Sequence, residues 1–473
     1  MRISVKTIGI YCASLAGMQE AFLHHLWRTK KVGPQFTSTA GHNIHVQKYG
    51  TLNLIGGPDF NDGLVSIDGQ SWAGRIEMHL RSSDWDRHGH TGDPEYDNVI
   101  LHVVWEHDKE ITLPTGQVLP VIALKGTIDP IVLERYLELY SAQQGKFIPC
   151  EQHIAGVDDF VVDNWMERML LERLESRQDR INRYLQHFKG DWEAVLFTLL
   201  LRSMGTKVNA ESFELLAMST PIKVIRKLRN NLMDLEALLL GQAGLLEAER
   251  SDATYTLWRD NYKRLAHMHD LRPVLVAPRF SGLRPPNFPT IRLSQLAAVY
   301  HGNETLFSSL MLSRKLKHMR AFFAHQASST WDSRFNFPKN AATHTPDAIT
   351  SSTPKNVVDE QHASIQGAGA PVAVNPKKLT TAFIDLLIIN TIVPLQFAYA
   401  RSQGRDDLER AIEILSEMKA ESNTIIKKFN SCRPGMVDNA FKSQAALQLK
   451  KEYCSELRCL DCAIGNSILR AGQ

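Results

Sequence analysis

The spacing of apolar residues changes twice along this chain, first near residue 43 and again near residue 128. Between residues 43 and 126, apolar and polar residues alternate in five short runs bounded by Gly, Asp and Pro, which is typical of β-strands. An amphipathic helix is predicted ahead of them, over residues 18–31. From Asp129 onward, apolar residues recur every three or four positions, which indicates helices with one buried face. The pattern predicts an α+β fold, in which an α/β domain with a mixed sheet precedes a larger all-helical domain.

Changes in composition suggest where the domains end. Residues 1–17 resemble a signal peptide only weakly, because glycines and Tyr11 interrupt the apolar stretch, so we interpret them as an extension without a function. A stretch rich in Ser, Thr, Ala, Pro and Gly predicts a flexible insertion. The expected boundaries are an α/β domain over 18–128, a helical domain over 129–326, the insertion over 327–376, and a helical C-terminal part over 377–473.

Composition restricts the compartment more than the partners. The net charge is only +3, which neither favours nor excludes nucleic acid. We expect no membrane-spanning helix, because we find no apolar run near the roughly 20 residues that a bilayer requires. Six cysteines in 473 residues are too few for a disulfide framework. A reducing, cytoplasmic location is therefore predicted, and the oligomeric state is left open.

Acidic and imidazole side chains gather on one predicted strand. Glu77 and His79 are two residues apart, so they share a face opposite the apolar face of Ile76 and Met78. A hairpin signal at Gly69-Gln70 would bring Asp59 beside this strand. Carboxylates aimed at a common point form a site for Mg²⁺ or Mn²⁺, which would bridge a phosphate oxygen and an attacking water.

Two other interpretations of this segment remain open. His79, His88 and His90 with Asp84 would suit zinc, since imidazole is a preferred zinc ligand, and His102 is a further polar candidate. The polar residues could also form a structural face without any ligand. Histidines in polar segments are commonly solvated.

The motif Pro-Asp, then 17 residues, then Glu-x-His resembles the signature of the PD-(D/E)xK nuclease superfamily. The resemblance implies a nuclease-like domain over 18–128, in which Asp59 and Glu77 bind the metal and Glu20 adds a helix carboxylate. His79 would occupy the position of the superfamily's lysine, as a third ligand or a general base. The implied activity is metal-dependent endo- or exonucleolytic hydrolysis of phosphodiester bonds. The alternative is a non-catalytic nucleic-acid-binding or scaffold protein that retains the fold.

Longer segments resemble a family of bacterial proteins of unknown function, the DUF2851 family. The segments are GPDFNDGLVSIDGQSWAGRIEMHLRSSDWDRHGHTGDPEYDNVILHVVWEHD, GTKVNAESFELLA and YCSELRCLDCAIGNSIL. This resemblance covers nearly the whole chain except residues 1–17 and the insertion. It implies a coherent family member and no particular activity.

Cysteines near the C-terminus have the spacing of metal ligands. Cys454, Cys459 and Cys462 could hold zinc or a [4Fe–4S] cluster, with Cys432 as the nearest fourth ligand and Cys150 as the distal one. Three ordinary thiols are the alternative.

Basic residues on two predicted helices could contact phosphate, although a solvated helix face is the preferred interpretation. They are Lys223, Arg226, Lys227, Arg229, Arg314, Lys315, Lys317 and Arg320.

Overall fold

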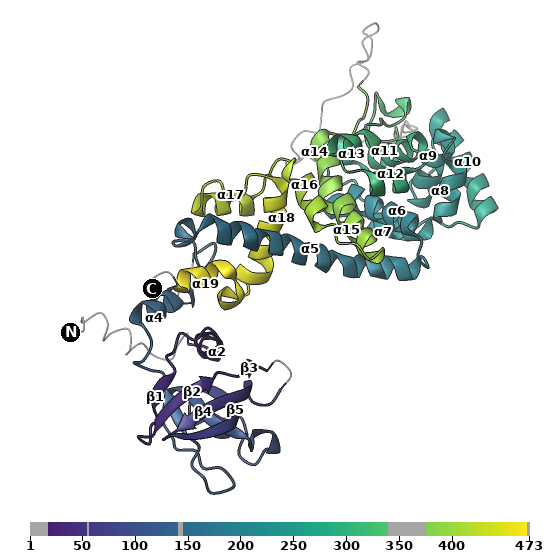
Figure 1. Cartoon of the computed structure of the whole chain (residues 1–473). Helices are drawn as coiled ribbons and strands as arrows, with labels where there is room; N and C mark the ends of the chain where they lie inside the picture. Colours follow the sequence, from purple (N-terminus) through teal and green to yellow (C-terminus); the bar gives the residue numbers. More distant parts are fainter. Residues whose placement is uncertain (1–17, 54–55, 141–144, 339–374, 471–473) are drawn as a thin grey trace, which may run out of the picture. The chain divides into compact units, whose positions relative to one another are not determined.

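The computed structural model describes residues 18–53, 56–140, 145–338 and 375–470 (Figure 1). The chain forms two compact units. The sheet unit comprises Met1–Leu170, Ala420–Asp438 and Lys442–Gln473, and the helical unit comprises Leu171–Lys419 and Asn439–Phe441. The predicted extension at 1–17 and most of the predicted insertion lie outside the described residues. The domain boundaries drawn from composition rest on a different criterion and stay a prediction.

The sheet has the strand order β1-β2-β4-β5-β6-β7, with β3 also paired to β4. Pairing is antiparallel from β1 to β5 and parallel from β5 to β7, so the mixed sheet expected from the sequence is confirmed. The backbone N–H of Thr39, just after β1, donates to the carbonyl of Val121 in β7 at 2.9 Å. The two ends of the sheet therefore approach each other. The strands are β1 (Gln35–Thr37), β2 (Asn43–Lys48), β3 (Thr51–Leu52), β4 (Phe60–Ile67), β5 (Gln70–Arg81), β6 (Val99–Glu106) and β7 (Val121–Ala123).

The hairpin between β4 and β5 turns at Asp68 and Gly69, which have φ values of 47° and 88°. Two left-handed residues in a two-residue loop match the right-handed twist of the strands. The expected hairpin is present, but its turn lies one residue earlier than Gly69-Gln70. The Asp68 carboxylate accepts the backbone N–H of Asn43 at 2.8 Å, which ties the turn to β2.

The connection from β5 to β6 is the predicted crossover. It contains the short helices α3 (Asp84–Arg87) and η1 (Pro94–Tyr96). A Cβ on Gly74 would lie 2.6 Å from the Asn98 carbonyl oxygen, so glycine is required where β6 begins beside β5. The seventh strand is shorter than the run over 118–126 because Pro120 has no N–H to donate.

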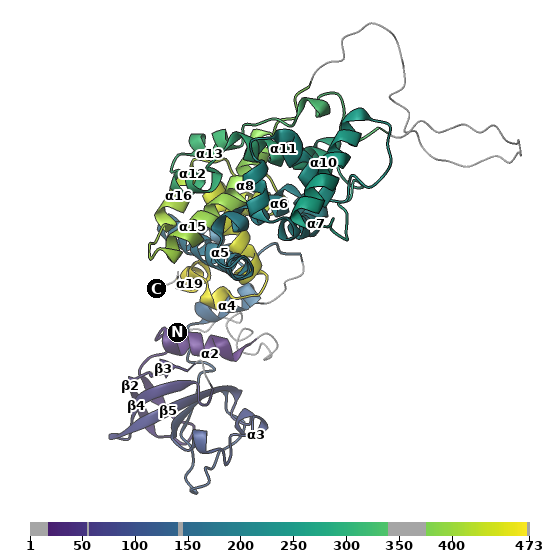
Figure 2. The same ribbon diagram turned by 90° about the vertical axis from the view of Figure 1, so that its right-hand side faces the viewer.

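Helix α2 (Glu20–Arg28) packs against β5 and β3 (Figures 1 and 2). Its apolar side buries Phe22, Leu23, Leu26 and Trp27, and Phe22 stacks on Tyr136 with ring centroids 3.8 Å apart. Residues 76–79 of β5 are all buried. The strand thus buries its polar face as well as the apolar face that the alternation indicated.

The remaining helices follow the predicted spacing of apolar residues every three or four positions. One run predicted as a single helix is divided. The run 221–244 forms two helices, because Asn231 caps a new helix through its side chain. The helices are α4 (Pro130–Tyr140), α5 (Asp159–His187), α6 (Trp192–Met204), α7 (Thr206–Ser219), α8 (Ile222–Leu228), α9 (Leu232–Gln242), α10 (Ala253–His269), α11 (Pro289–Gly302), α12 (Leu306–Leu312), α13 (Leu316–Phe322), α14 (Thr381–Leu387), α15 (Val393–Ser402), α16 (Leu408–Ser416), α17 (Thr424–Cys432), α18 (Ala440–Leu449) and α19 (Ala463–Arg470).

One helical segment corrects an expectation about apolar runs. Thr381–Ser402, with α14 and α15 joined by a π-helical turn, is long and apolar enough to cross a membrane. An 18-residue window of it has a mean hydropathy of 1.6, and 67% of that window is buried inside the protein. The core helix of a soluble protein passes the same test, so the segment is weak evidence for a membrane span.

Candidate carboxylate and histidine site

Glu77 and His79 form the floor of a polar cluster on β5. His79 is 1% exposed and Glu77 is 5% exposed. The His79 Nε2 atom lies 3.4 Å from Glu77 Oε1, and its Nδ1 lies 2.9 Å from Nε2 of His102 on β6. The two parallel strands therefore hold three titratable side chains in contact beneath the surface.

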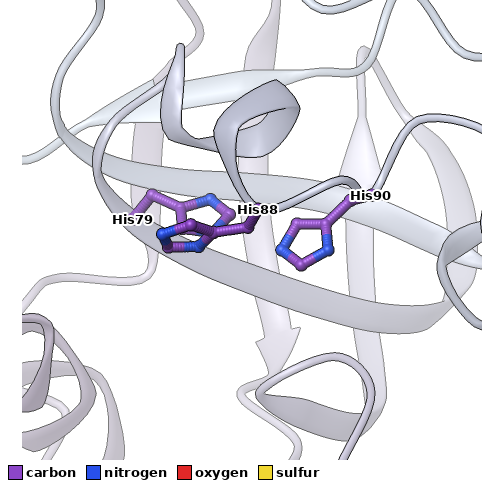
Figure 3. A group of neighbouring side chains, drawn as sticks. All are labelled: His79, His88 and His90. Carbon is purple, nitrogen blue, oxygen red and sulfur yellow. The ribbon is translucent and has the colours of Figure 1, made fainter.

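The crossover adds two imidazoles to this floor. His88 Nδ1 lies 3.1 Å from His79 Nε2, and His90 Nε2 lies 3.4 Å from Glu77 Oε1. One nitrogen from each of His79, His88 and His90 lies within 4.8 Å of the others, and Figure 3 shows the three rings side by side. His90 Nε2 is buried and makes no hydrogen bond. An imidazole nitrogen in that state is available to a metal ion.

Acidic groups close the other side. The backbone N–H of Asp59 donates to Glu77 Oε2 at 3.0 Å, and the N–H of Met78 donates to Asp59 Oδ2 at 2.9 Å. The two carboxylates are thus neighbours, as the motif spacing indicated. From α2, His24 Nε2 lies 3.2 Å from Asp59 Oδ2. Glu20 lies one helical turn before His24. Burial raises the pKa of the Glu20 carboxyl, and the charge of Asp59 also acts to raise it.

We use the term carboxylate–histidine site for Glu20, His24, Asp59, Glu77, His79, His88, His90 and His102. Its rim reaches solvent at His88, which is exposed, and at Glu20, His24 and Asp59, which are partly exposed. Its floor is closed. The rim residues, unlike those of the floor, are therefore in contact with solvent.

The protonation states follow from burial and from the neighbours. Burial, and then the Asp59 carboxylate, raise the pKa of Glu77 from its usual 4.5 to about 9. Burial, and then His90 and His88, lower the pKa of His79 to about 3. Burial also lowers the pKa values of His90 and His102. At neutral pH these three histidines are neutral, and Glu77 holds a proton unless a cation replaces it.

Most of the candidate site residues named from the sequence lie together in the fold, and Asp84 is the exception. Asp59, Glu77, Glu20, His79, His88, His90 and His102 all come together. Asp84 does not join the three histidines. Its Oδ2 accepts the N–H of Arg81 at 3.0 Å and its Oδ1 pairs with Arg87 at 3.0 Å, so Glu77 is the carboxylate beside the imidazoles.

Two residues of this region were missed in the sequence. His24 is four positions after Glu20, so both side chains lie on one helix face, and that spacing could have indicated its role. Tyr96 stacks on His90 with ring centroids 3.8 Å apart. Burial, and then Glu77, raise the pKa of Tyr96 to about 12. The sequence around Tyr96 contains no pattern that would predict its approach to Glu77 on β5.

The C-terminal cysteines also regroup. Cys454, Cys459 and Cys462 are buried in the sheet unit, and Cys150 is the thiol that interacts with all three. Cys432 is only half-buried, and the neighbours that affect its pKa are Glu151 and Lys428. The choice of Cys432 as the fourth metal ligand stays a prediction, and in the fold the distal alternative, Cys150, is the thiol that interacts with the other three.

Several of the basic helix residues are used inside the helical unit. Arg226 pairs with Asp191 and Glu193, and Arg320 pairs with Asp385 at 2.7 Å. These ion pairs leave less of the predicted basic face for phosphate than the sequence alone indicates.

The fold and the site define a class: a two-unit α+β protein whose mixed sheet carries a partly enclosed cluster of carboxylates and imidazoles. Within that class, the chain belongs to the family described as protein of unknown function DUF2851, whose model matches residues 20–359 and 367–424. The resemblance to this family is confirmed. No curated protein and no solved structure matches the chain. Every residue of the carboxylate–histidine site lies in the first matched range.

Proposed function

We propose that this protein is a metal-dependent nuclease that hydrolyses phosphodiester bonds of nucleic acid. The observation that carries the proposal is the meeting of carboxylates from three elements, Glu20, Asp59 and Glu77, beside the neutral imidazole of His79. A helix, antiparallel strands, a crossover and a parallel strand surround them. This order supports the resemblance to the PD-(D/E)xK superfamily.

The donor set fits a divalent cation. The buried Glu77 carboxyl is raised to a pKa of about 9 partly because other carboxylates face it, and a cation relieves that repulsion. Asp59, Glu77 and Glu20 would hold Mg²⁺ or Mn²⁺, and the imidazoles of His79, His88 and His90 widen the choice to zinc. When bound, such an ion supplies positive charge for a phosphate oxygen and makes water a better nucleophile.

The histidines of the site take different roles in the proposed reaction. With a pKa of about 3, His79 is a poor proton acceptor at neutral pH, so it acts as a ligand or positioning residue. His102 holds the His79 ring from below through the 2.9 Å contact. His88 is the imidazole at the exposed rim, where it can accept a proton from an attacking water.

A cavity in the helical unit supports an anionic polymer as substrate. It has a volume of about 540 Å³, and its lining contains no Asp or Glu. Arginine side chains and hydroxyl groups suit phosphate recognition by paired N–H donors and hydrogen bonds. The basic lining residues are Arg177, Arg180, Arg183 and Arg202, of which Arg202 pairs with Glu214 and Arg177 donates to Asn390.

One observation favours the alternative, a non-catalytic nucleic-acid-binding or scaffold protein. Histidine replaces the superfamily's lysine at residue 79, and its side chain is almost fully enclosed. A metal held there could fix the crossover to β5 without contacting any substrate.

A nuclease assay distinguishes the two functions. Wild type, Glu77→Gln and Asp59→Asn are incubated with single- and double-stranded DNA and RNA in Mg²⁺, Mn²⁺ or Zn²⁺. Cleavage should fall by about 100-fold or more in both variants, because each removes a charged oxygen from the donor set. Asp86→Asn is the matched control, since Asp86 lies in the same crossover and pairs with Lys109 at the surface. Absence of cleavage by wild type, or equal cleavage by Glu77→Gln, would favour the scaffold.

A further inference from the structure

Four cysteine side chains from distant parts of the sequence are buried in the sheet unit. Cys150 precedes α5, and Cys454, Cys459 and Cys462 lie between α18 and α19. Their exposed fractions are 8%, 9%, 7% and 6%. All of them carry free thiols.

The backbone around Cys459 and Cys462 forms a tight turn. The N–H of Cys462 donates to the Cys459 carbonyl at 3.3 Å, and α19 begins directly afterwards. A Cβ on Gly465 would lie 2.2 Å from that same carbonyl oxygen, so glycine is required for this close approach. The turn therefore brings the backbones of Cys459 and Cys462 close together.

Cys150 lies among the other three thiols. Burial raises its pKa well above the usual value, and Cys454, Cys462 and Cys459 raise it further, in that order. Burial, and then Cys462 and Cys459, raise the pKa of Cys454, and burial and then Cys462 raise the pKa of Cys459 to about 12. The Lys450 ammonium lies 5.3 Å from the centroid of the Phe147 ring, which independently places the segment before Cys150 beside the segment that leads to Cys454.

Hydrogen-bond donors face the group. Burial raises the pKa of the Cys462 thiol to about 11, and the backbone N–H groups of Gly465 and Ile464 and the indole of Trp165 act against this increase. The indole nitrogen of Trp165 is buried and has no hydrogen-bond partner of good geometry. The Trp165 ring also contacts Tyr453, with centroids 5.3 Å apart, which places α5 beside the cysteine segment. Donors aimed at sulfur stabilise thiolates in metal centres.

We propose that Cys150, Cys454, Cys459 and Cys462 are the four ligands of a thiolate metal centre. Two ions share this chemistry, zinc and iron in an iron–sulfur cluster. Around zinc, Zn–S bonds of about 2.3 Å bring sulfurs to about 3.8 Å from one another. Within the described part of the chain, no three of these sulfurs lie within 4.8 Å of one another. Metal content distinguishes the two ions. The proposal does not depend on nuclease activity.

Ordinary packing explains less of what is observed. A buried cysteine often behaves as a small apolar residue, and one such residue would need no explanation. Packing alone does not account for four thiols from two distant segments in one place, or for the donors directed at Cys462. Cys432 is the internal comparison, because it is half-buried at the end of α17 and no other thiol affects it.

The test is metal analysis of full-length protein purified without oxygen. Wild type should contain either about four irons with acid-labile sulfide and a brown colour, or about one zinc per chain. Cys150→Ser should lower the metal content by about tenfold, whereas Cys432→Ser should leave it unchanged. Metal-free wild-type protein, or equal metal content in wild type and Cys150→Ser, would overturn the proposal.

A second measurement keeps the test valid if Cys150→Ser fails to fold. Thiols of wild type are titrated before and after unfolding in the presence of a chelator. Four of the six thiols should react only after unfolding, together with release of the metal. Release of no metal on unfolding would contradict the proposal without any variant.

Discussion

Glu77 in the sheet unit and Glu236 in the helical unit are both buried acids, with exposed fractions of 5% and 1%. Burial raises the pKa of each. Their neighbours differ in kind. Glu236 on α9 accepts a hydrogen bond from the Ser294 hydroxyl on α11, and the neighbours that most affect it are donors that lower its pKa. Glu77 instead faces the carboxylates of Asp59 and Glu20, which raise its pKa.

The difference separates a structural acid from a candidate ligand. A buried carboxyl surrounded by donors is satisfied by the protein itself, and no further group is needed. A buried carboxyl opposite other carboxylates is unsatisfied unless it takes a proton or a cation. Burial alone would have ranked Glu236 ahead of Glu77, so the charge of the neighbours is the better criterion for a site.

The largest expected effect is on metal affinity. Glu77→Gln should weaken Mn²⁺ binding by about 100-fold, because a charged oxygen is lost from the donor set, whereas Glu236→Gln should leave it unchanged. Isothermal titration calorimetry of both variants and wild type provides the measurement. If both substitutions weakened Mn²⁺ binding equally, the charge of the neighbouring groups would not distinguish a metal ligand from a structural acid.

A smaller effect is expected on stability without metal. The folded-state pKa of Glu77, about 9, is above its unfolded value near 4.5, so its contribution to stability is complete below pH 4.5 and is lost as pH rises toward 9. Between pH 5 and 6.5, the unfolding free energy of wild type should fall by about 2 kcal/mol more than that of Glu77→Gln, and the difference should keep growing toward pH 8. Histidines with lowered pKa values act in the opposite direction, but they are present in both proteins and cancel.

Urea unfolding with a chelator at pH 5, 6.5 and 8 measures this difference. The two proteins should be nearly equal at pH 5, and the variant should be the more stable at pH 8. Parallel stability curves would mean that Glu77 is not held at a raised pKa in the folded protein.

The smallest effect tests the structural acid. Ser294→Ala removes one hydroxyl donor to Glu236 and should cost about 1 kcal/mol of unfolding free energy, because a buried acceptor loses one of its partners. Mn²⁺ affinity should not change. Thermal unfolding and calorimetry check the two halves of this prediction, and an altered Mn²⁺ affinity would be evidence against the separation of the two roles.

Some of the site could be predicted because strand geometry is local. Glu77 and His79 share a face through the two-residue repeat, and the hairpin brings Asp59 beside them. The mixed sheet followed from the polar crossover between two strand-like runs. These inferences need only the chain within about 25 residues of each position.

The rest depends on docking between elements. His88 and His90 meet His79 because α3 folds back on β5, and His24 arrives with α2. Sequence proximity favoured Cys432 as the fourth cysteine, whereas in the fold Cys150 is the thiol that interacts with Cys454, Cys459 and Cys462. The repeat of apolar residues specifies which face of an element is buried. It does not specify which neighbouring element covers that face.

The sheet unit is assembled from both sides of the helical unit in the chain, since Met1–Leu170 and Lys442–Gln473 belong to the same compact body. A ribosome adds roughly 5–20 residues per second, so the first part of this unit waits roughly 10–50 s while Leu171–Lys419 is synthesised. For that interval Cys150 has none of the thiols that later surround it, and α4 lacks the packing of α19. Because synthesis runs toward the C-terminus, the sheet unit is begun before the helical unit and completed after it.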